Sequence, residues 1–115
     1  MKKKLADLKL RQNLSDALRA AQERLAQEFR IDRILLFGSV VRGTAAEGSD
    51  EDLLIVLKEP ADHPIRDRIS NIILDVNLAY ETNLSELIVD RETWDQGIPS
   101  SLPIHKIIEE EGVSL

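Results

Sequence analysis

The chain has 115 residues, a formal net charge of −6 and an isoelectric point near 4.9, a length that fits one domain with a modest core. The excess of acids and an aromatic content of 3% disfavour nucleic-acid binding, which uses Lys and Arg for phosphates and aromatic rings for bases. The absence of cysteine excludes disulfides and thiolate metal sites and favours the cytoplasm, and no apolar run is long enough to span a membrane.

Apolar residues recur every three or four positions through residues 5–29, which predicts an amphipathic helix at the N-terminus. Asn13 or Ser15 could cap a second start, so one long helix and two shorter helices both fit this segment. Its apolar stripe is typical of a helix that packs on a sheet, and its basic first dozen residues also fit an arm that binds a partner.

The rest of the chain alternates between short apolar runs and helical patterns. The apolar runs predict strands at residues 33–37, 50–57 and 84–89. The helical patterns predict a single turn ended by Gly43, a long helix and two closing helices, at residues 39–42, 65–80, 91–96 and 103–111.

This order of elements predicts an α/β (α+β) domain in which helices flank a small mixed sheet of three to four strands. We expect a single domain over residues 1–115. Its catalytic core would span residues 31–90, after the N-terminal helix, and a closing helical segment would occupy residues 91–112.

Two aspartates one residue apart open the second strand. Side chains alternate along a strand, so Asp50 and Asp52 should project to the same side, about 7 Å apart. Two carboxylates at that distance repel by roughly 2 to 3 kcal/mol at an effective dielectric near 20. Folding alone gives no reason for this pair, whereas Mg²⁺ prefers carboxylate and phosphate oxygens.

The first strand ends in Gly38-Ser39, where glycine permits a tight turn into a helical turn. Such a turn presents unpaired backbone N–H groups that suit a phosphate. Ser39 adds a hydroxyl group, and Arg42, about one turn later, adds a fixed positive charge. A phosphate cradle on one strand and a metal clamp on the next are what metal-assisted nucleotidyl transfer requires.

The same chemistry predicts a third carboxylate on a neighbouring strand, to complete the metal that activates the attacking hydroxyl. Glu86 is the first acidic residue inside the third apolar run and is therefore the candidate. Asp75, on the long helix, and Asp90, at the far end of the run, fit less well.

The spacing Gly38-Ser39, ten residues (Val40 to Ser49) and then Asp50-Glu51-Asp52 resembles the signature of the nucleotidyltransferase superfamily that includes DNA polymerase beta and kanamycin nucleotidyltransferase. It is more closely similar to the minimal nucleotidyltransferases, or MNT proteins, the antitoxins encoded beside HEPN-domain partners. Residues 37–43 match the phosphate loop of that group, and residues 103–113 resemble its closing helix.

The resemblance implies a polymerase-beta-like fold and a Mg²⁺-dependent protein adenylyltransferase. Gly38, Ser39 and Arg42 would bind the nucleotide, while Asp50, Asp52 and Glu86 would bind two Mg²⁺ ions and Glu86 would help to activate the acceptor. AMP would pass from ATP to a tyrosine hydroxyl of a HEPN-type ribonuclease toxin, which would be neutralised and would form a hetero-oligomer with this chain.

Two positions depart from the family pattern: Glu51 stands where the family has an apolar residue and should point to the opposite face of the sheet, and Glu86 stands where the family has aspartate. Two other functions fit the same motifs. One is a non-catalytic antitoxin that acts by forming a complex. The other is nucleotidyl transfer to a small molecule such as an aminoglycoside, although the chain lacks the extra helical domain that such enzymes use.

Overall fold

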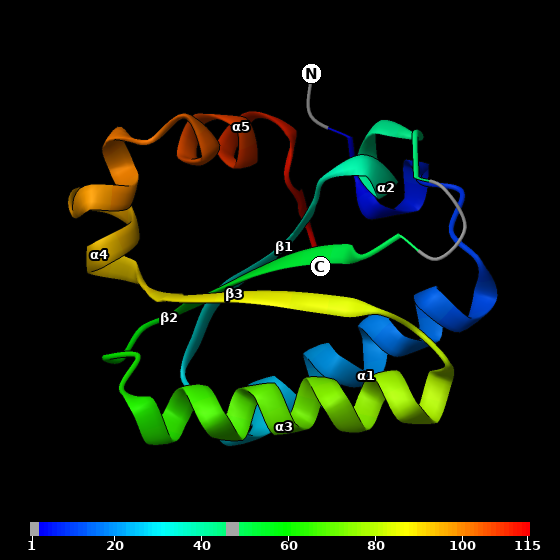
Figure 1. Cartoon of the computed structure of the whole chain (residues 1–115), viewed down its shortest axis with the longest axis horizontal. Helices are drawn as coiled ribbons and strands as arrows, with labels where there is room; N and C mark the ends of the chain where they lie inside the picture. Colours follow the sequence, from blue (N-terminus) through cyan, green and yellow to red (C-terminus); the bar gives the residue numbers. More distant parts are fainter. Residues whose placement is uncertain (1–2, 46–48) are drawn as a thin grey trace.

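The computed structural model describes residues 3–45 and 49–115 and has a four-stranded mixed sheet as its centre (Figure 1). The strand order is β3-β2-β1-β4, with β2 and β3 parallel and the other neighbours antiparallel. The strands are β1 (Ile31–Phe37), β2 (Glu51–Leu57), β3 (Leu84–Asp90) and β4 (Val113–Ser114). The expectation of a small mixed sheet flanked by helices is therefore confirmed.

Helices cover both faces of this sheet (Figure 1). The longest, α1 (Gln12–Glu28) and α3 (His63–Tyr80), lie side by side on one face. The other layer holds the short helices α4 (Arg91–Gln96) and α5 (Pro103–Glu111), with a 3-10 turn at Ile98–Ser101 between them. The helical turn α2 (Ser39–Arg42) and a 3-10 turn at Leu5–Asp7 pack Val41 and Leu5 against the same core as α1 and α3. None of the helices in the described residues combines the length and apolar character that crossing a membrane requires.

The central strand β2 explains why the chain forms two cores. Its residues Leu53 to Leu57 are all buried, because alternate side chains enter the two helical layers. Leu53, Ile55 and Leu57 join the larger cluster under α1 and α3. Leu54 and Val56 join a smaller cluster with Trp94 of α4 and Ile108 of α5.

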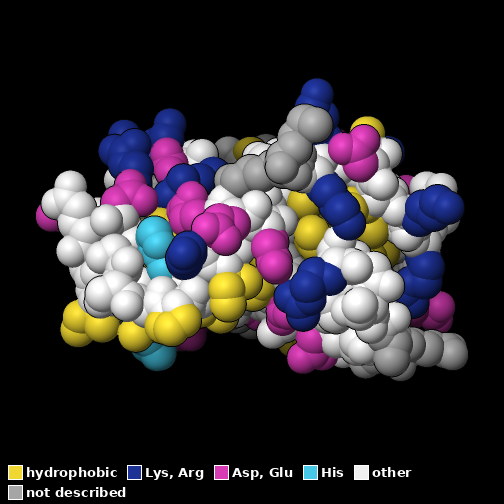
Figure 2. All heavy atoms as spheres, turned by 90° about the horizontal axis from the view of Figure 1, so that it is seen from above, with side chains coloured by type: hydrophobic (Ala, Val, Ile, Leu, Met, Phe, Trp, Pro, Cys, Tyr) yellow, Lys and Arg dark blue, Asp and Glu magenta, His cyan; other side chains and the backbone are white. Residues whose placement is uncertain are grey.

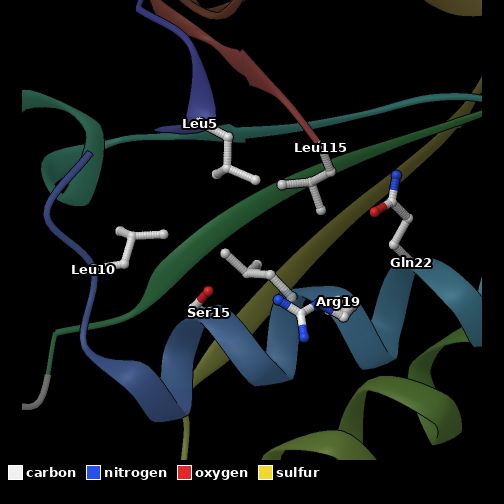
Figure 3. Close-up of a pocket in the computed structure, with 7 residues that line it drawn as sticks. Leu5, Leu10, Ser15, Arg19, Gln22 and Leu115 are labelled. Carbon is white, nitrogen blue, oxygen red and sulfur yellow. The ribbon is translucent and has the colours of Figure 1, made fainter. Parts of the chain in front are cut away.

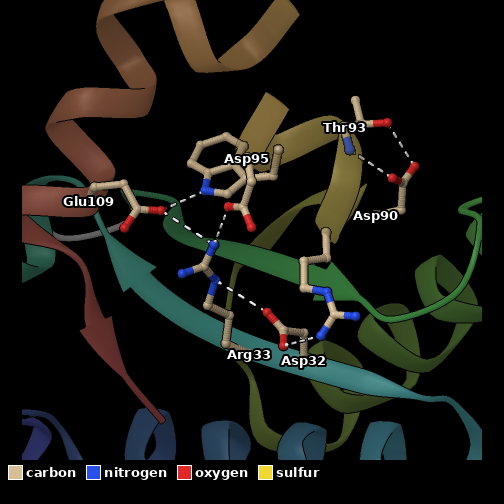
Figure 4. Close-up of polar contacts among 8 residues, drawn as sticks. Asp32, Arg33, Asp90, Thr93, Asp95 and Glu109 are labelled. Atoms are coloured by element: carbon tan, nitrogen blue, oxygen red, sulfur yellow. Dashed lines mark hydrogen bonds and ion pairs between the residues drawn. The ribbon is translucent and has the colours of Figure 1, made fainter. Parts of the chain in front are cut away.

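Polar contacts fasten α4 and α5 to the sheet on the side of the smaller cluster (Figure 4). Trp94 Nε1 donates to Glu109 Oε1 at 2.6 Å, joining the two helices. Arg33 of β1 forms ion pairs with Asp95 at 3.0 Å and Glu109 at 3.5 Å. At the start of α4, Asp90 accepts hydrogen bonds from the backbone N–H and the hydroxyl of Thr93.

The N-terminal segment differs from the single amphipathic helix expected over residues 5–29. A 3-10 turn at Leu5–Asp7 is closed by Asp7 Oδ2, which accepts from the Lys4 backbone N–H at 2.9 Å, and α1 starts only at Gln12. Arg11 stays extended because its guanidinium reaches Glu51 Oε1 at 2.7 Å. The segment is therefore divided in two, but the predicted caps are wrong, since Asn13 and Ser15 both lie inside α1 and Arg11 is its N-cap.

The structure also adds an element that the sequence pattern does not predict. After α5 the chain passes through Gly112 into β4, where Val113 pairs with Leu36 and Ser114 with Leu35. A two-residue strand is too short to produce an alternating apolar pattern, so pairing with β1 defines it.

Candidate active site

The turn between β1 and α2 depends on glycine. Gly38 has a φ of +87°, in the left-handed region that other residues rarely adopt, and its carbonyl accepts from the Val41 N–H at 3.1 Å. Gly43 ends α2 with a φ of +75°. The predicted turn over residues 39–42 is thus confirmed, and its first backbone N–H groups, starting at Ser39, have no acceptor within the helix.

Asp52 lies directly against this turn. It pairs with Phe37 across the antiparallel β1–β2 ladder, and a Cβ atom added to Gly38 would lie 2.5 Å from Asp52 Oδ2. Only glycine leaves room for the carboxylate in this place. The structure therefore brings together Gly38, Ser39 and Asp52, which the sequence predicted to serve one site.

The charge environment of Asp52 includes both Asp50 and Arg42. Burial raises the pKa of Asp52, the negative charge of Asp50 raises it further, and the positive charge of Arg42 opposes both effects. Asp50 is exposed and accepts a hydrogen bond from Asn83 Nδ2 at 2.5 Å. Both acids and Arg42 thus lie close enough to interact.

The residues present fit a divalent cation beside a phosphate. Mg²⁺ is commonly held by one or two carboxylates together with substrate phosphates, and two repelling acids beside a glycine turn supply such a donor set. Residues 3–45 and 49–115 contain no group of three or more His, Cys, Asp or Glu side chains placed to hold a metal ion. The ligands of any metal ion here would therefore come from Asp50, Asp52 and the phosphates of the substrate.

Glu86 does not join this pair, contrary to the prediction that it supplies the third carboxylate. In the parallel β2–β3 ladder Glu86 pairs with Leu53, and Ser85 pairs with Asp52. Paired residues share a face, so Glu86 faces the layer of α1 and α3, as Leu84 does. The positions of β3 on the face of Asp52 are Ser85, Leu87 and Val89.

The surroundings of Glu86 are those of a half-buried side chain. Burial raises its pKa, and the hydrogen bond from its own backbone N–H lowers it by a smaller amount. Its Oε2 atom is buried and has no hydrogen-bond partner among the described residues. Glu51 also points away from the acid pair, as its place between two aspartates predicted, and is 5% exposed.

Three contacts at the site have no signal in the sequence. Arg42 forms an ion pair with Glu111 of α5 at 3.4 Å, across 69 positions of the chain. Lys3 Nζ donates to the Val41 carbonyl at 3.1 Å, and Asn83 orients Asp50. Such contacts depend on how distant elements pack, so no local pattern reveals them.

A cavity lies away from the acid pair, between the N-terminal segment, α1 and the C-terminus (Figure 3). It measures about 110 Å³, and Leu5, Leu10, Arg19 and Leu115 are among the residues that line it. None of its lining residues belongs to the predicted site. We therefore place the chemistry at the turn after β1 and not in this cavity.

Comparisons with known proteins show the family of this chain. Residues 18–113 match the family described as "Nucleotidyltransferase domain". Two curated relatives from Methanocaldococcus jannaschii are each 37% identical: "Putative protein adenylyltransferase MJ0141" over 59 residues and "Putative protein adenylyltransferase MJ1305" over 82 residues. These matches cover 51% and 67% of this chain, and the chain spans 60% and 55% of the respective relatives.

A solved structure described as "Structure of putative minimal nucleotidyltransferase" superposes with a TM-score of 0.62 at 23% sequence identity. The superposition covers 89% of this chain and 92% of that one. At this level of identity the likeness supports the fold. The four-stranded mixed sheet with helices on both faces is thus the arrangement of a nucleotidyltransferase domain.

Proposed function

Because the chain belongs to the nucleotidyltransferase domain family, we propose that it transfers AMP from ATP to a protein hydroxyl group. The acceptor is a tyrosine of a HEPN-type ribonuclease toxin, which the modification neutralises, so the chain acts as the antitoxin. The observation that carries this proposal is the close approach of Asp52 to Gly38. It places one of the two acids against the turn whose backbone N–H groups would bind phosphate. The names of the two curated relatives support protein adenylylation.

The residues divide the work of an in-line transfer. The Ser39 hydroxyl and the backbone N–H groups of the turn bind the phosphates of ATP, and Arg42 neutralises part of their charge. Asp50 and Asp52 would hold Mg²⁺, which when bound would lower the cost of the charge that builds up on the phosphates. A bond forms between the acceptor oxygen and the α-phosphorus, the bond to pyrophosphate breaks, and the hydroxyl proton leaves to solvent.

The experiment combines the purified chain, ATP, Mg²⁺ and a HEPN-type acceptor, with intact-protein mass spectrometry as the readout. We expect the acceptor to gain the mass of AMP, and Asp52→Asn to abolish this gain. Asp75→Asn on α3 is the matched control, because Asp75 is exposed on the other layer and should leave transfer unchanged. An acceptor that stays unmodified with the wild-type chain would refute the proposal.

One observation favours a second candidate, an antitoxin that neutralises its partner by binding alone. Glu86 lies on the face opposite Asp52, so the described site has two acids where the family chemistry was expected to use three. In that case an Asp50→Asn/Asp52→Asn double variant would still protect cells from the toxin. Loss of protection in this variant, with the complex still intact, would exclude it.

A further inference from the structure

The surface formed by Ile98, Leu102, Ile104 and Ile107, here called the α5 apolar surface, exposes large aliphatic side chains. Ile98 is 80% exposed and the other three are 45% exposed. All four lie within ten consecutive residues: Ile98 on the 3-10 turn Ile98–Ser101, Leu102 at the junction, and Ile104 and Ile107 on α5. Figure 2 shows hydrophobic side chains gathered along one edge of the face that carries α4 and α5. Exposed apolar groups that cluster in this way mark binding surfaces.

Folding of the domain does not account for these side chains. Ile108 is fully buried in the smaller cluster and anchors α5 to the sheet. Ile104 and Ile107, three residues apart, are exposed neighbours on the same helix. The apolar stripe of the helix therefore extends beyond the part that the core covers.

The α5 apolar surface leads to the candidate active site. Glu111, four residues after Ile107, is in the last turn of α5 and pairs with Arg42 of the phosphate turn at 3.4 Å. A helix rises about 1.5 Å per residue, so Ile104 lies about 10 Å along the helix from Glu111. A protein seated on this surface would lie beside the nucleotide and could present a side chain to it.

Charge indicates the chemistry of the occupant. Glu110 and Glu111 at the exposed end of α5 pair with Lys106 at 4.0 Å and with Arg42 at 3.4 Å, so the charge preference comes from the whole chain, which has a net charge of −6. Complementary charges guide association and exclude wrong partners. A partner with an apolar patch bordered by Lys and Arg fits this surface better than an acidic one does.

We propose that the α5 apolar surface docks the acceptor protein through a matching apolar patch with a basic border. This inference rests on the proposed function, because the α5 apolar surface would hold the acceptor protein during AMP transfer. Residues of α5 and of the preceding 3-10 turn position the acceptor, while Asp50, Asp52 and the phosphate turn act on ATP.

The test measures binding of the purified HEPN-type acceptor without ATP, by titration calorimetry, for the full chain and two double variants. Ile104→Lys/Ile107→Lys should weaken binding at least tenfold. Leu74→Lys/Leu78→Lys is the matched control, since these leucines are 55% and 73% exposed on α3 in the other layer. The α3 control variant should bind the acceptor as tightly as wild type, and thermal unfolding should show that both double variants fold.

A second variant, Ile98→Lys/Leu102→Lys, keeps the test decisive if the α5 variant does not fold, and it should show the same loss. Equal binding by all variants, equal loss in the α3 control, or no binding by wild type would overturn the proposal. A wild-type dimer in sedimentation that the α5 variant abolishes would identify a second copy as the occupant and would also overturn it. Wild type that binds the acceptor without modifying it would refute the transfer reaction alone.

Discussion

The two faces of the sheet differ in what they bury. Under α1 and α3, helices of 17 and 18 residues, lies the larger cluster, built from aliphatic side chains and Phe29. The other face has helices of six and nine residues, a small cluster around Trp94, and ion pairs that bridge β1 to α4 and α5. One face thus supplies most of the stability, while the thinner face leaves room for the acid pair and the phosphate turn.

The largest expected effect comes from a matched pair of truncations in β2. Leu53 and Leu54 are adjacent and fully buried, but Leu53 enters the larger cluster and Leu54 the smaller one. We expect Leu53→Ala to lower the free energy of unfolding by about 3–5 kcal/mol and Leu54→Ala by about 2–3 kcal/mol. The difference arises because the short helices over Leu54 can move to fill part of the cavity. Chemical denaturation of both variants measures the difference in unfolding free energy.

Equal losses in the two variants would mean that the faces contribute alike to stability. A larger loss for Leu54→Ala would mean that the face under α4 and α5 contributes more to stability than the face under α1 and α3. A Leu54→Met variant keeps the side-chain volume and should cost less than about 1.5 kcal/mol, which controls for the change in chemistry.

The next effect concerns activity on the thinner face. Gly38→Ala forces a Cβ atom to within 2.5 Å of Asp52 Oδ2 and strains a φ of +87°. We expect transfer to fall about 100-fold or more, since small misplacements of reacting groups cost that much. Gly43→Ala is the control because it has a similar φ of +75° with no atom within 4 Å of the added Cβ. Steady-state kinetics should show a much smaller loss for Gly43→Ala, and similar losses in both variants would contradict the role of the close approach.

The sequence predicts the local parts of this site and misses the distant ones. The turn at Gly38 and the acid pair follow from glycine chemistry and strand alternation over a few residues. The face of Glu86 depends on the register in which β3 pairs with β2, where Leu53 is its neighbour. The alternation of Leu84, Glu86 and Ile88 was a signal that Glu86 shares their face, but only pairing relates that face to Asp52.

A third prediction concerns the ion pair that fastens the N-terminal segment behind the acid pair. The Glu51 side chain is 7% exposed and bonds Arg11 at 2.7 Å, while its Oε2 atom has no partner in the described part of the chain. Arg11→Ala leaves this buried charge uncompensated and should cost about 1–3 kcal/mol of stability. Adding Glu51→Leu should recover most of the loss, because an apolar residue then faces the larger cluster.

A double-mutant cycle by urea unfolding gives the coupling energy between Arg11 and Glu51. Arg24→Ala is the matched control, since its partner Asp75 is 63% exposed at 3.4 Å and such pairs contribute less than about 1 kcal/mol. A coupling near zero would show that the N-terminal segment is held by other contacts.

The smallest effect tests the placement of Glu86. Burial raises its pKa in the folded chain, so folding is favoured more when Glu86 is protonated, and stability falls as pH rises through the folded-state pKa. Glu86→Gln removes this loss and should slightly stabilise the chain at neutral pH, with a benefit that shrinks towards pH 4. Unfolding free energies measured between about pH 4 and pH 7 test this trend.

The same Glu86→Gln variant should keep its transfer rate, because Glu86 faces α1 and α3. If Glu86→Gln instead lost as much transfer activity as Asp52→Asn, Glu86 would have to be assigned to the metal site.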